Sequence, residues 1–349
     1  MTKPYEFRGN GYHALADRDA WARRRREPAL EPELPIIDPH HHVWDDQRGR
    51  YLAHELADDT GDGHHIVATV FVEAGVMYRA DGPPAMRPVG EVEVVNGIAA
   101  MGASGNYGKT RLCAGIIGHA DLLLGDAVQP VLEALTAAGN GRFKGIRYAT
   151  IWDTGNAAKF GRHQVARHLL LDPVFRQGFA HLQPPGLSFD AWLFHPQLSD
   201  LADLLRAFPE ANVVMDHCGG LLGIPPHDGD RDATFKVWHA QIRALAQFPN
   251  LTVKVGGLGM LYCGWDFHLR DMPPSSEDLA AAWRPYVEAC IAAFGPARCM
   301  LESNFPVDKQ SCGYGVLWNA MKRITIGCSA AEKAALYHDT AARVYRLAV

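Results

Sequence analysis

From residue 34 onward, short apolar runs alternate with longer amphipathic segments, and the alternation continues to the end of the chain. The short runs are partly β-branched and are bounded by Gly, Pro or Asn, which is typical of buried β-strands. Longer segments with apolar residues at the helical period, such as 126–138 and 198–208, lie between them and predict helices. The expected strands cover residues 35–40, 66–74, 113–120, 143–149, 189–195, 212–217, 251–257 and 299–304.

Two later segments carry the signal with which a helix begins. Ser275 with Asp278, and Ser329 with Glu332, have the spacing of capping boxes, in which each side chain binds the other residue's backbone N–H. These signals predict helices that begin at residues 275 and 329.

Eight strand candidates in succession, alternating with helical segments, predict an α/β fold of the (β/α)8 TIM-barrel type. A doubly wound sheet is the alternative, but eight consecutive units favour a closed barrel. We expect one barrel domain over residues 34–349, preceded by an N-terminal arm over residues 1–33. The stretches 75–96 and 257–275 contain Gly and Pro and are expected to form loops over the C-terminal face.

Composition excludes several classes of protein. The 349 residues are 48% hydrophobic, enough for one large core, and the net charge of −5 argues against a nucleic-acid partner. The basic run at residues 23–26 is expected to lie on a solvated face of the arm. No segment reaches the roughly 18 apolar residues of a membrane span, so we expect a cytoplasmic protein without a membrane partner. Seven cysteines without CxxC spacing argue against a disulfide framework or a structural zinc site.

Polar residues gather where the expected strands end, which is the catalytic face of a barrel. Three consecutive histidines follow the first strand. Side chains two residues apart share a face of a strand, so His40 and His42 point together and His41 points away. Such a pair can present two imidazole nitrogens to one metal ion, or it can be a hydrogen-bonded pair at the barrel mouth. The later strand ends contribute Glu73, His119, Asp121, Arg147, Tyr148, His195, Asp216, His217, Lys254, Glu302, Asn304 and Asp308.

These motifs resemble the amidohydrolase superfamily, most of all its amidohydrolase-2 branch of TIM-barrel metal-dependent hydrolases. The resemblance covers residues 34–349. It rests on "IIDPHHHVWD" and "MLESNFPVD", and "MDHCGG" and the closing "TAARVYRL" support it. That branch contains lactonases beside nonoxidative decarboxylases of aromatic and muconate-like acids.

The resemblance implies a metal site that departs from the usual pattern. His40 and His42 match the strand-1 pair, and His195 lies near a strand-5 ligand of the decarboxylases. His217 matches the strand-6 histidine that polarises or activates the reacting group. Asn304 stands where the family has an aspartate that binds the metal and takes a proton from water. The resemblance therefore implies one divalent ion, zinc, held chiefly by the histidines, or a site that binds metal weakly or not at all.

Asparagine cannot serve as the anionic base, and two other carboxylates are candidates to replace it. Glu302 lies two residues earlier on the same strand face, and Glu73 is the alternative. Because no strand-4 lysine stands in line for carbamylation and Arg147 lies closer to that place, a binuclear centre is not expected.

The interpretation is a hydrolase of a small lactone that carries carboxylate or hydroxyl groups. Water attacks the carbonyl with His217, Glu302 and Asn304 as the catalytic residues. Arg147, Lys254 and Glu73 form the substrate-binding group, in which either cation can hold a substrate carboxylate. The alternative is a metal-dependent decarboxylase of an aromatic or muconate-like acid, and a third interpretation is a barrel that only binds its ligand. The expected partner is a small molecule, and the sequence leaves a homo-oligomer open.

Overall fold

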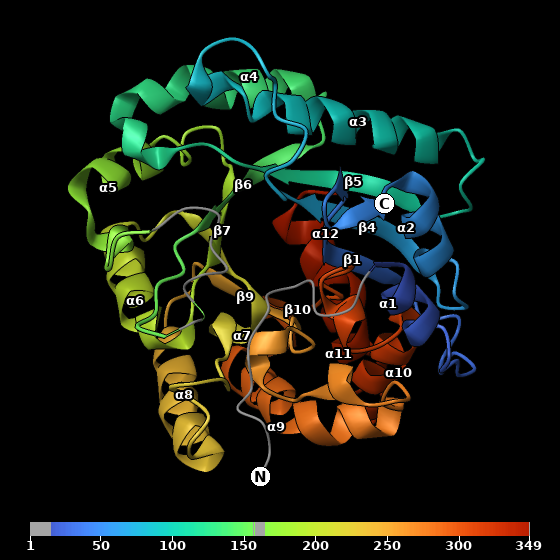
Figure 1. Ribbon diagram of the computed structural model, residues 1–349. Helices are drawn as coiled ribbons and strands as arrows, with labels where there is room; N and C mark the ends of the chain where they lie inside the picture. The colour runs from blue at the N-terminus through green and yellow to red at the C-terminus, as the bar shows by residue number, and fades with distance from the viewer. Residues whose placement is uncertain (1–14, 156, 158–164, 349) are drawn as a thin grey trace.

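The computed structural model describes residues 15–155, 157 and 165–348. Eight parallel strands follow one another around a barrel, as the alternation of apolar runs predicts, with helices outside them (Figure 1). The strands are β1 (Ile36–His41), β4 (Ile66–Val72), β5 (Arg111–Gly118), β6 (Phe143–Ala149), β7 (Ser188–Trp192), β8 (Asn212–Met215), β9 (Leu251–Val255) and β10 (Cys299–Leu301).

The barrel closes at its C-terminal face rather than along the full length of the first and last strands. The backbone N–H of Asn304 donates to the carbonyl of His40 at 2.9 Å, and that of His42 donates to Phe305 at 2.7 Å. Closure therefore depends on the same segments that carry the histidine run and Asn304. A short antiparallel hairpin, β2 (Trp44–Asp46) and β3 (Gly49–Tyr51), follows the histidines and was not predicted.

Helices surround the strands. The two predicted capping boxes are present at Ser275 and Ser329. The expected loop over residues 75–96 is only partly correct, because a helix already begins at Val89 behind the prolines. The helices are α1 (Leu15–Ala22), α2 (Ala53–Thr60), α3 (Val89–Ala103), α4 (Gln129–Gly139), α5 (Pro173–Ala180), α6 (Leu198–Ala207), α7 (His217–Gly220), α8 (Arg231–Leu245), α9 (Ser276–Phe294), α10 (Tyr314–Ile324), α11 (Ala330–Ala334) and α12 (Thr340–Val344).

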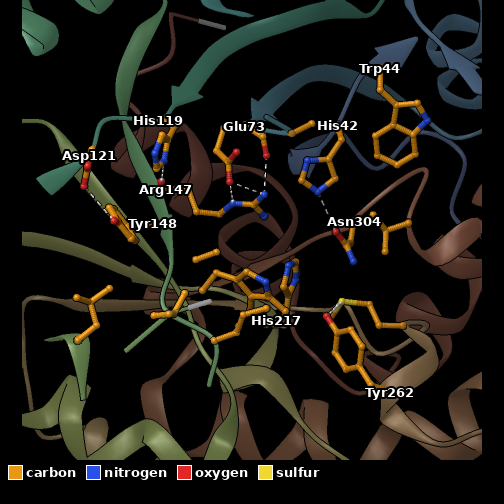
Figure 2. Close-up of a pocket in the computed structure, with 18 of the residues that line it drawn as sticks. His42, Trp44, Glu73, His119, Asp121, Arg147, Tyr148, His217, Tyr262 and Asn304 are labelled. Carbon is orange, nitrogen blue, oxygen red and sulfur yellow. Dashed lines mark hydrogen bonds and ion pairs between the residues drawn. The ribbon is translucent and has the colours of Figure 1, made fainter. Parts of the chain in front are cut away.

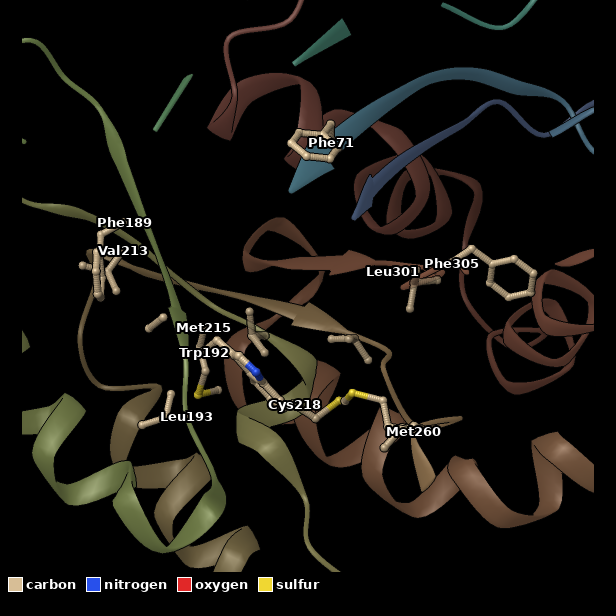
Figure 3. Close-up of a cluster of buried hydrophobic side chains, with 14 of the residues drawn as sticks. Phe71, Phe189, Trp192, Leu193, Val213, Met215, Cys218, Met260, Leu301 and Phe305 are labelled. Carbon is tan, nitrogen blue, oxygen red and sulfur yellow. The ribbon is translucent and has the colours of Figure 1, made fainter. Parts of the chain in front are cut away.

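Apolar side chains fill the barrel below the catalytic face. Ile37, Val70 and Met300 belong to an inner cluster that packs against Tyr345 just after α12. A larger cluster extends outward between strands and helices, and it includes Trp192, which lies among the buried side chains of Figure 3. Among the described residues the barrel interior is thus a packed core, and the cavity lies at the C-terminal face.

The described part of the N-terminal arm is bound to the barrel. Arg24 and Arg25 donate to the carbonyls of Asp271 and Pro273 at 2.9 and 2.8 Å. Two arginines of the basic run thus bind the arm to the loop that contains Asp271 and Pro273. A purely solvated face was expected. Residues 1–14 lie outside the described residues. Within the described chain, no helix combines the length and apolarity that crossing a bilayer requires.

Candidate active site

The histidine run at the end of β1 presents two rings to the site and one to the barrel wall. His40 and His42 approach each other with 3.3 Å between their Nε2 atoms. His41 packs edge-on against Phe71, and its Nε2 lies 3.8 Å from the sulfur of Cys113. The alternation of a strand therefore separates His41 from its neighbours, as the spacing predicts.

A carbonyl fixes the tautomer of His42. Its Nδ1 lies 2.8 Å from the carbonyl oxygen of Val72, which can only accept, so Nδ1 carries the proton. The other nitrogen, Nε2, then presents a lone pair to the site. Burial lowers the pKa of both His40 and His42 well below the usual histidine value, which keeps the rings neutral. Neutral imidazoles with an oriented second nitrogen are suited to ligating a metal.

Asn304 faces the same point with an oxygen. Its backbone has a φ of +54°, a left-handed conformation that asparagine tolerates better than most residues. The amide Nδ2 donates to Asp308 Oδ1 at 2.8 Å, which turns the amide oxygen toward His42 Nε2 at 3.3 Å. Since Nδ1 holds the ring proton, a lone pair on His42 meets a lone pair on Asn304. Two acceptors that converge in this way fit a cation between them.

The spacing of these nitrogen and oxygen atoms also fits a metal ion. In a tetrahedral site with metal–nitrogen bonds of about 2.0–2.1 Å, neighbouring ligand atoms lie about 3.4 Å apart. The separations of His42 Nε2 from His40 Nε2 and from Asn304 Oδ1 are both 3.3 Å. His40, His42 and Asn304 could therefore hold one ion, with an amide oxygen where the resemblance leads one to expect a carboxylate.

His217 begins α7, directly after β8, and is paired with Glu302. Its Nδ1 lies 2.7 Å from Glu302 Oε1, while the other carboxylate oxygen lies 3.0 Å from His40 Nδ1. Gly257 leaves room for this ring, because a Cβ at that position would lie 2.4 Å from His217 Nδ1. Burial lowers the pKa of His217 to about 3 and raises the pKa of Glu302 well above its usual value, against the opposing charge of Lys254.

Below His40 lies a buried cluster of charges. Lys254 Nζ is 2.6 Å from Asp190 Oδ2, 3.1 Å from Asp216 Oδ1 and 3.2 Å from His40 Nδ1. His40, Asp216 and His217 form the one group of His, Cys, Asp and Glu among the described residues whose ligand atoms lie within 4.8 Å of one another. The ammonium of Lys254 already supplies a positive charge there. The Nε2 atom, on the other side of the His40 ring, is the one that approaches His42.

Two of the predicted site residues lie elsewhere. Lys254 is fully buried inside the barrel and does not line the cavity, so the geometry gives it no contact with a substrate. His195 lies beyond the end of β7, where its Nδ1 accepts from the backbone N–H of Leu222 and its ring packs on His227. It is not placed with His40 and His42, and the geometry does not support a role for it as their co-ligand.

Arg147 and Glu73 do line the cavity, but they bind each other. Arg147 Nε donates to Glu73 Oε1 at 2.9 Å, Nη2 donates to the carbonyl of Glu73, and Nη1 lies 3.4 Å from His40 Nε2. Figure 2 shows this pair between His119 and His42. The guanidinium that was expected to hold a substrate carboxylate is thus already committed to a carboxylate of the protein.

The cavity above these residues has a volume of about 580 Å³ and is bordered by several aromatic rings. Trp44 is stacked on His42 with ring centroids 6.1 Å apart, and Trp192 meets His217 edge-on at 4.7 Å. Sequence reasoning assigned no role to Trp44 or to Asp190. A tryptophan two residues after the last histidine, and an aspartate inside an otherwise apolar strand, were the available signals.

A (β/α)8 barrel with paired histidines at the end of its first strand defines a class of barrel hydrolases. Residues 37–347 match the family model described as amidohydrolase, and the chain belongs to that family. It is an amidohydrolase-type enzyme.

Relatives of known sequence span almost the same length. The uncharacterised protein y4mH of Sinorhizobium fredii is 33% identical over 90% of this chain and 99% of that protein. An L-fucono-1,5-lactonase of Burkholderia multivorans is 27% identical over 89% of this chain and 96% of its own. The family therefore includes lactonases that align with nearly the whole barrel.

Solved structures agree on the fold. An amidohydrolase from Burkholderia multivorans with bound zinc has a TM-score of 0.67 and 24% identity, covering 89% of this chain and 99% of that one. A 5-carboxyvanillate decarboxylase from Sphingomonas paucimobilis has a TM-score of 0.54 and 14% identity, covering 90% and 99%. At these identities the likeness is one of architecture, which serves both hydrolases and decarboxylases.

Proposed function

We propose that this enzyme is a lactonase, which opens a small cyclic ester by adding water to its carbonyl carbon. The observation that carries the proposal is the hydrogen bond between His217 and Glu302 at the wall of the cavity that His42 and Asn304 also line. A neutral imidazole backed by a carboxylate is a general base for water. The alignment with L-fucono-1,5-lactonases supports an ester ring as the substrate.

In the proposed reaction, His217 moves the proton. Its Nδ1–H donates a hydrogen bond to Glu302 and keeps its proton, which leaves the Nε2 lone pair for a water molecule in the cavity. As the water oxygen bonds to the lactone carbonyl carbon, Nε2 takes a proton and Glu302 stabilises the imidazolium that forms. The ring C–O bond then breaks, the same proton goes to the departing oxygen, and a hydroxy acid is released.

We further propose that His40, His42 and Asn304 hold one divalent ion, zinc. When bound, such an ion supplies a Lewis acid that polarises a carbonyl or lowers the pKa of water. In this arrangement Glu302, acting through His217, supplies the carboxylate that Asn304 lacks. Glu73 is the weaker candidate for this carboxylate, because it already forms an ion pair with Arg147.

The test is a pH-stat measurement at pH 7.5 on zinc-loaded protein, with δ-valerolactone, an aldono-1,5-lactone and 5-carboxyvanillate as probes. Lactone hydrolysis releases one proton per turnover, whereas decarboxylation consumes a proton and releases CO2. Acid release that saturates with lactone concentration supports the proposal. CO2 release from the aromatic acid, without any acid release from the lactones, would replace the proposal by the decarboxylase. Binding without turnover of any probe would indicate a ligand-binding barrel.

A further inference from the structure

One wall of the cavity is built from side chains that the proposed reaction does not use. His119 and Asp121 follow β5, and Tyr148 lies near the end of the neighbouring strand β6. The rings of His119 and Tyr148 lie 5.3 Å apart, and the Tyr148 hydroxyl donates to Asp121 Oδ1 at 3.1 Å. Figure 2 shows the three together, on the far side of Arg147 from His42 and Asn304. We call them the acceptor wall.

After the hydrogen bonds within the acceptor wall are formed, the atoms left to face a ligand are hydrogen-bond acceptors. His119 Nδ1 lies 3.4 Å from the carbonyl of Arg147, and in the neutral tautomer that donates to this carbonyl Nε2 is an acceptor. Asp121 Oδ1 receives the Tyr148 hydroxyl and the N–H of Leu123, while Oδ2 has no donor among the described residues. The Tyr148 hydroxyl already donates its hydrogen bond to Asp121, so its oxygen can only accept further hydrogen bonds. A ligand must therefore bring the protons, as the hydroxyls of a polyol do.

In the described lining, both arginine side chains are already paired with carboxylates of the protein. Arg147 is bound to Glu73, and Arg48 is bound to Asp46 through Nε at 3.1 Å and Nη2 at 2.7 Å while it covers the ring of Trp44. To bind either arginine in the same way, a substrate carboxylate would have to compete with the carboxylate already paired there. At the acceptor wall it would also face the negative charge of Asp121.

We infer that the acceptor wall recognises the hydroxyl groups of an uncharged, polyhydroxylated lactone. The inference rests on the proposed lactonase function and narrows its substrate class from carboxylated or hydroxylated rings to hydroxylated ones. The lactone carbonyl lies near His217 and Asn304, and the ring hydroxyls donate to Asp121, His119 and Tyr148. These three residues determine specificity and take no part in the bond-breaking step.

The experiment compares Asp121→Asn and Tyr148→Phe with the native enzyme. Asparagine keeps the oxygen that caps Leu123 N–H, and phenylalanine keeps the packing of Tyr148 on Phe175. The matched control is Asp126→Asn, since Asp126 is exposed on the same η3 segment (Leu122–Val128) and its carboxylate binds Gln177 and His181, away from the acceptor wall. The probes are a hexono-1,5-lactone, δ-valerolactone and 2-pyrone-4,6-dicarboxylate, with kcat and KM measured for each.

The readout is preference, defined as kcat/KM for the hexonolactone divided by kcat/KM for δ-valerolactone. We expect Asp121→Asn to lower this preference by about 10- to 100-fold, the scale for a hydrogen bond to a charged group, mostly through KM. Tyr148→Phe should lower it by about 3- to 10-fold, and Asp126→Asn should leave it unchanged. Unchanged preference in both wall variants, or a native preference for the dicarboxylate, would overturn the inference while lactonase activity stands. If the native enzyme hydrolyses none of the lactones, the proposed lactonase function itself is contradicted.

Discussion

His217 and Glu302 are joined by a hydrogen bond of 2.7 Å between Nδ1 and Oε1, and the other oxygen of Glu302 lies 3.0 Å from His40. One buried carboxylate thus contacts both the proposed base and a proposed metal ligand. It lies two residues before Asn304, the position at which the resemblance leads one to expect an aspartate. The arrangement places a carboxyl group behind the imidazole instead of directly beside the reacting water.

If His217 and Glu302 act as a unit, their variants should not be additive. We expect Glu302→Gln and His217→Gln each to lower kcat by on the order of 10²-fold or more. The double variant should be no worse than the poorer single variant, because removing either member disables the pair. Steady-state kinetics on all three proteins checks this, with zinc content measured on each. Losses that multiply in the double variant would show that the two residues act separately.

The three histidines of β1 should respond differently to alanine. His40→Ala and His42→Ala are expected to abolish turnover and to reduce bound zinc, since each removes a donor at the metal position. His41→Ala should retain zinc and most activity but lower the free energy of unfolding by about 1–3 kcal/mol, because His41 is buried against Phe71. Metal analysis and denaturant unfolding separate the two effects. Equal loss of zinc in all three variants would contradict the alternation of the strand.

The barrel could be predicted because each strand is buried on both sides and so forms an apolar run. The same regularity placed His40 and His42 on one face. Alternation stopped being informative at His195, because β7 ends at Trp192 and the chain has already left the strand. For Lys254 the sequence placed the residue on an expected strand but did not show how deeply it is buried. This residue lies on β9 among strands that supply Asp190 and Asp216, which bind its ammonium below the cavity.

Side-chain contacts between segments far apart in the chain could not be predicted from the sequence. No residue near Arg147 in the sequence indicates that its guanidinium will form an ion pair with Glu73. The pairing depends on the neighbouring ends of β4, β5 and β6. The hairpin that brings Trp44 over His42 is likewise too short to give a periodic signal.

Acid should destabilise the protein through His41. Burial lowers its pKa to about 4 from 6.5, so the unfolded chain binds this proton more readily. The stabilisation is complete above pH 6.5 and is lost as the pH falls to about 4, a change of about 3 kcal/mol. Asp38 acts in the opposite sense, since burial raises its pKa to about 6 and protonation in the folded state offsets part of the loss.

The contribution of His41 is isolated by comparison with His41→Gln, in which Asp38 is unchanged. Between pH 7.5 and pH 4, the free energy of unfolding of the variant should improve relative to the native protein by about 3 kcal/mol. Urea unfolding at several pH values measures this difference. A difference that does not vary with pH would show that His41 binds its proton equally in both states.

Lys254 should be required for stability rather than for substrate affinity. Replacing it by methionine leaves Asp190 and Asp216 buried without their cation, and we expect a loss of about 3–5 kcal/mol in the free energy of unfolding. Asp190→Asn in the same protein should recover part of that loss, because it removes one of the uncompensated charges. If a folded Lys254→Met protein shows native stability but a raised KM, Lys254 contacts substrate after all.

The pair formed by Asn304 and Asp308 allows the missing aspartate to be restored in two ways with different outcomes. The Asn304 amide donates to Asp308 Oδ1 at 2.8 Å, and burial already raises the pKa of Asp308 well above its usual value. Asn304→Asp alone therefore sets two carboxylates against each other without an N–H between them. We expect tighter zinc binding than in the native protein, since zinc prefers an anionic oxygen, together with lower stability of the metal-free form.

The exchange of both residues, Asn304→Asp with Asp308→Asn, restores one donor and one acceptor at this contact and keeps the carboxylate at the metal position. This double variant should recover the stability of the native metal-free protein and retain the tighter zinc affinity of Asn304→Asp. Asp308→Asn alone is the control for the lost acceptor of Gly259 N–H, which Asp308 Oδ2 binds at 2.8 Å. Zinc titration with a competing chelator and metal-free unfolding curves measure the two quantities independently. Native zinc affinity in both proteins that carry Asn304→Asp would show that residue 304 does not face the metal, and that the ion binds to the histidines from another side.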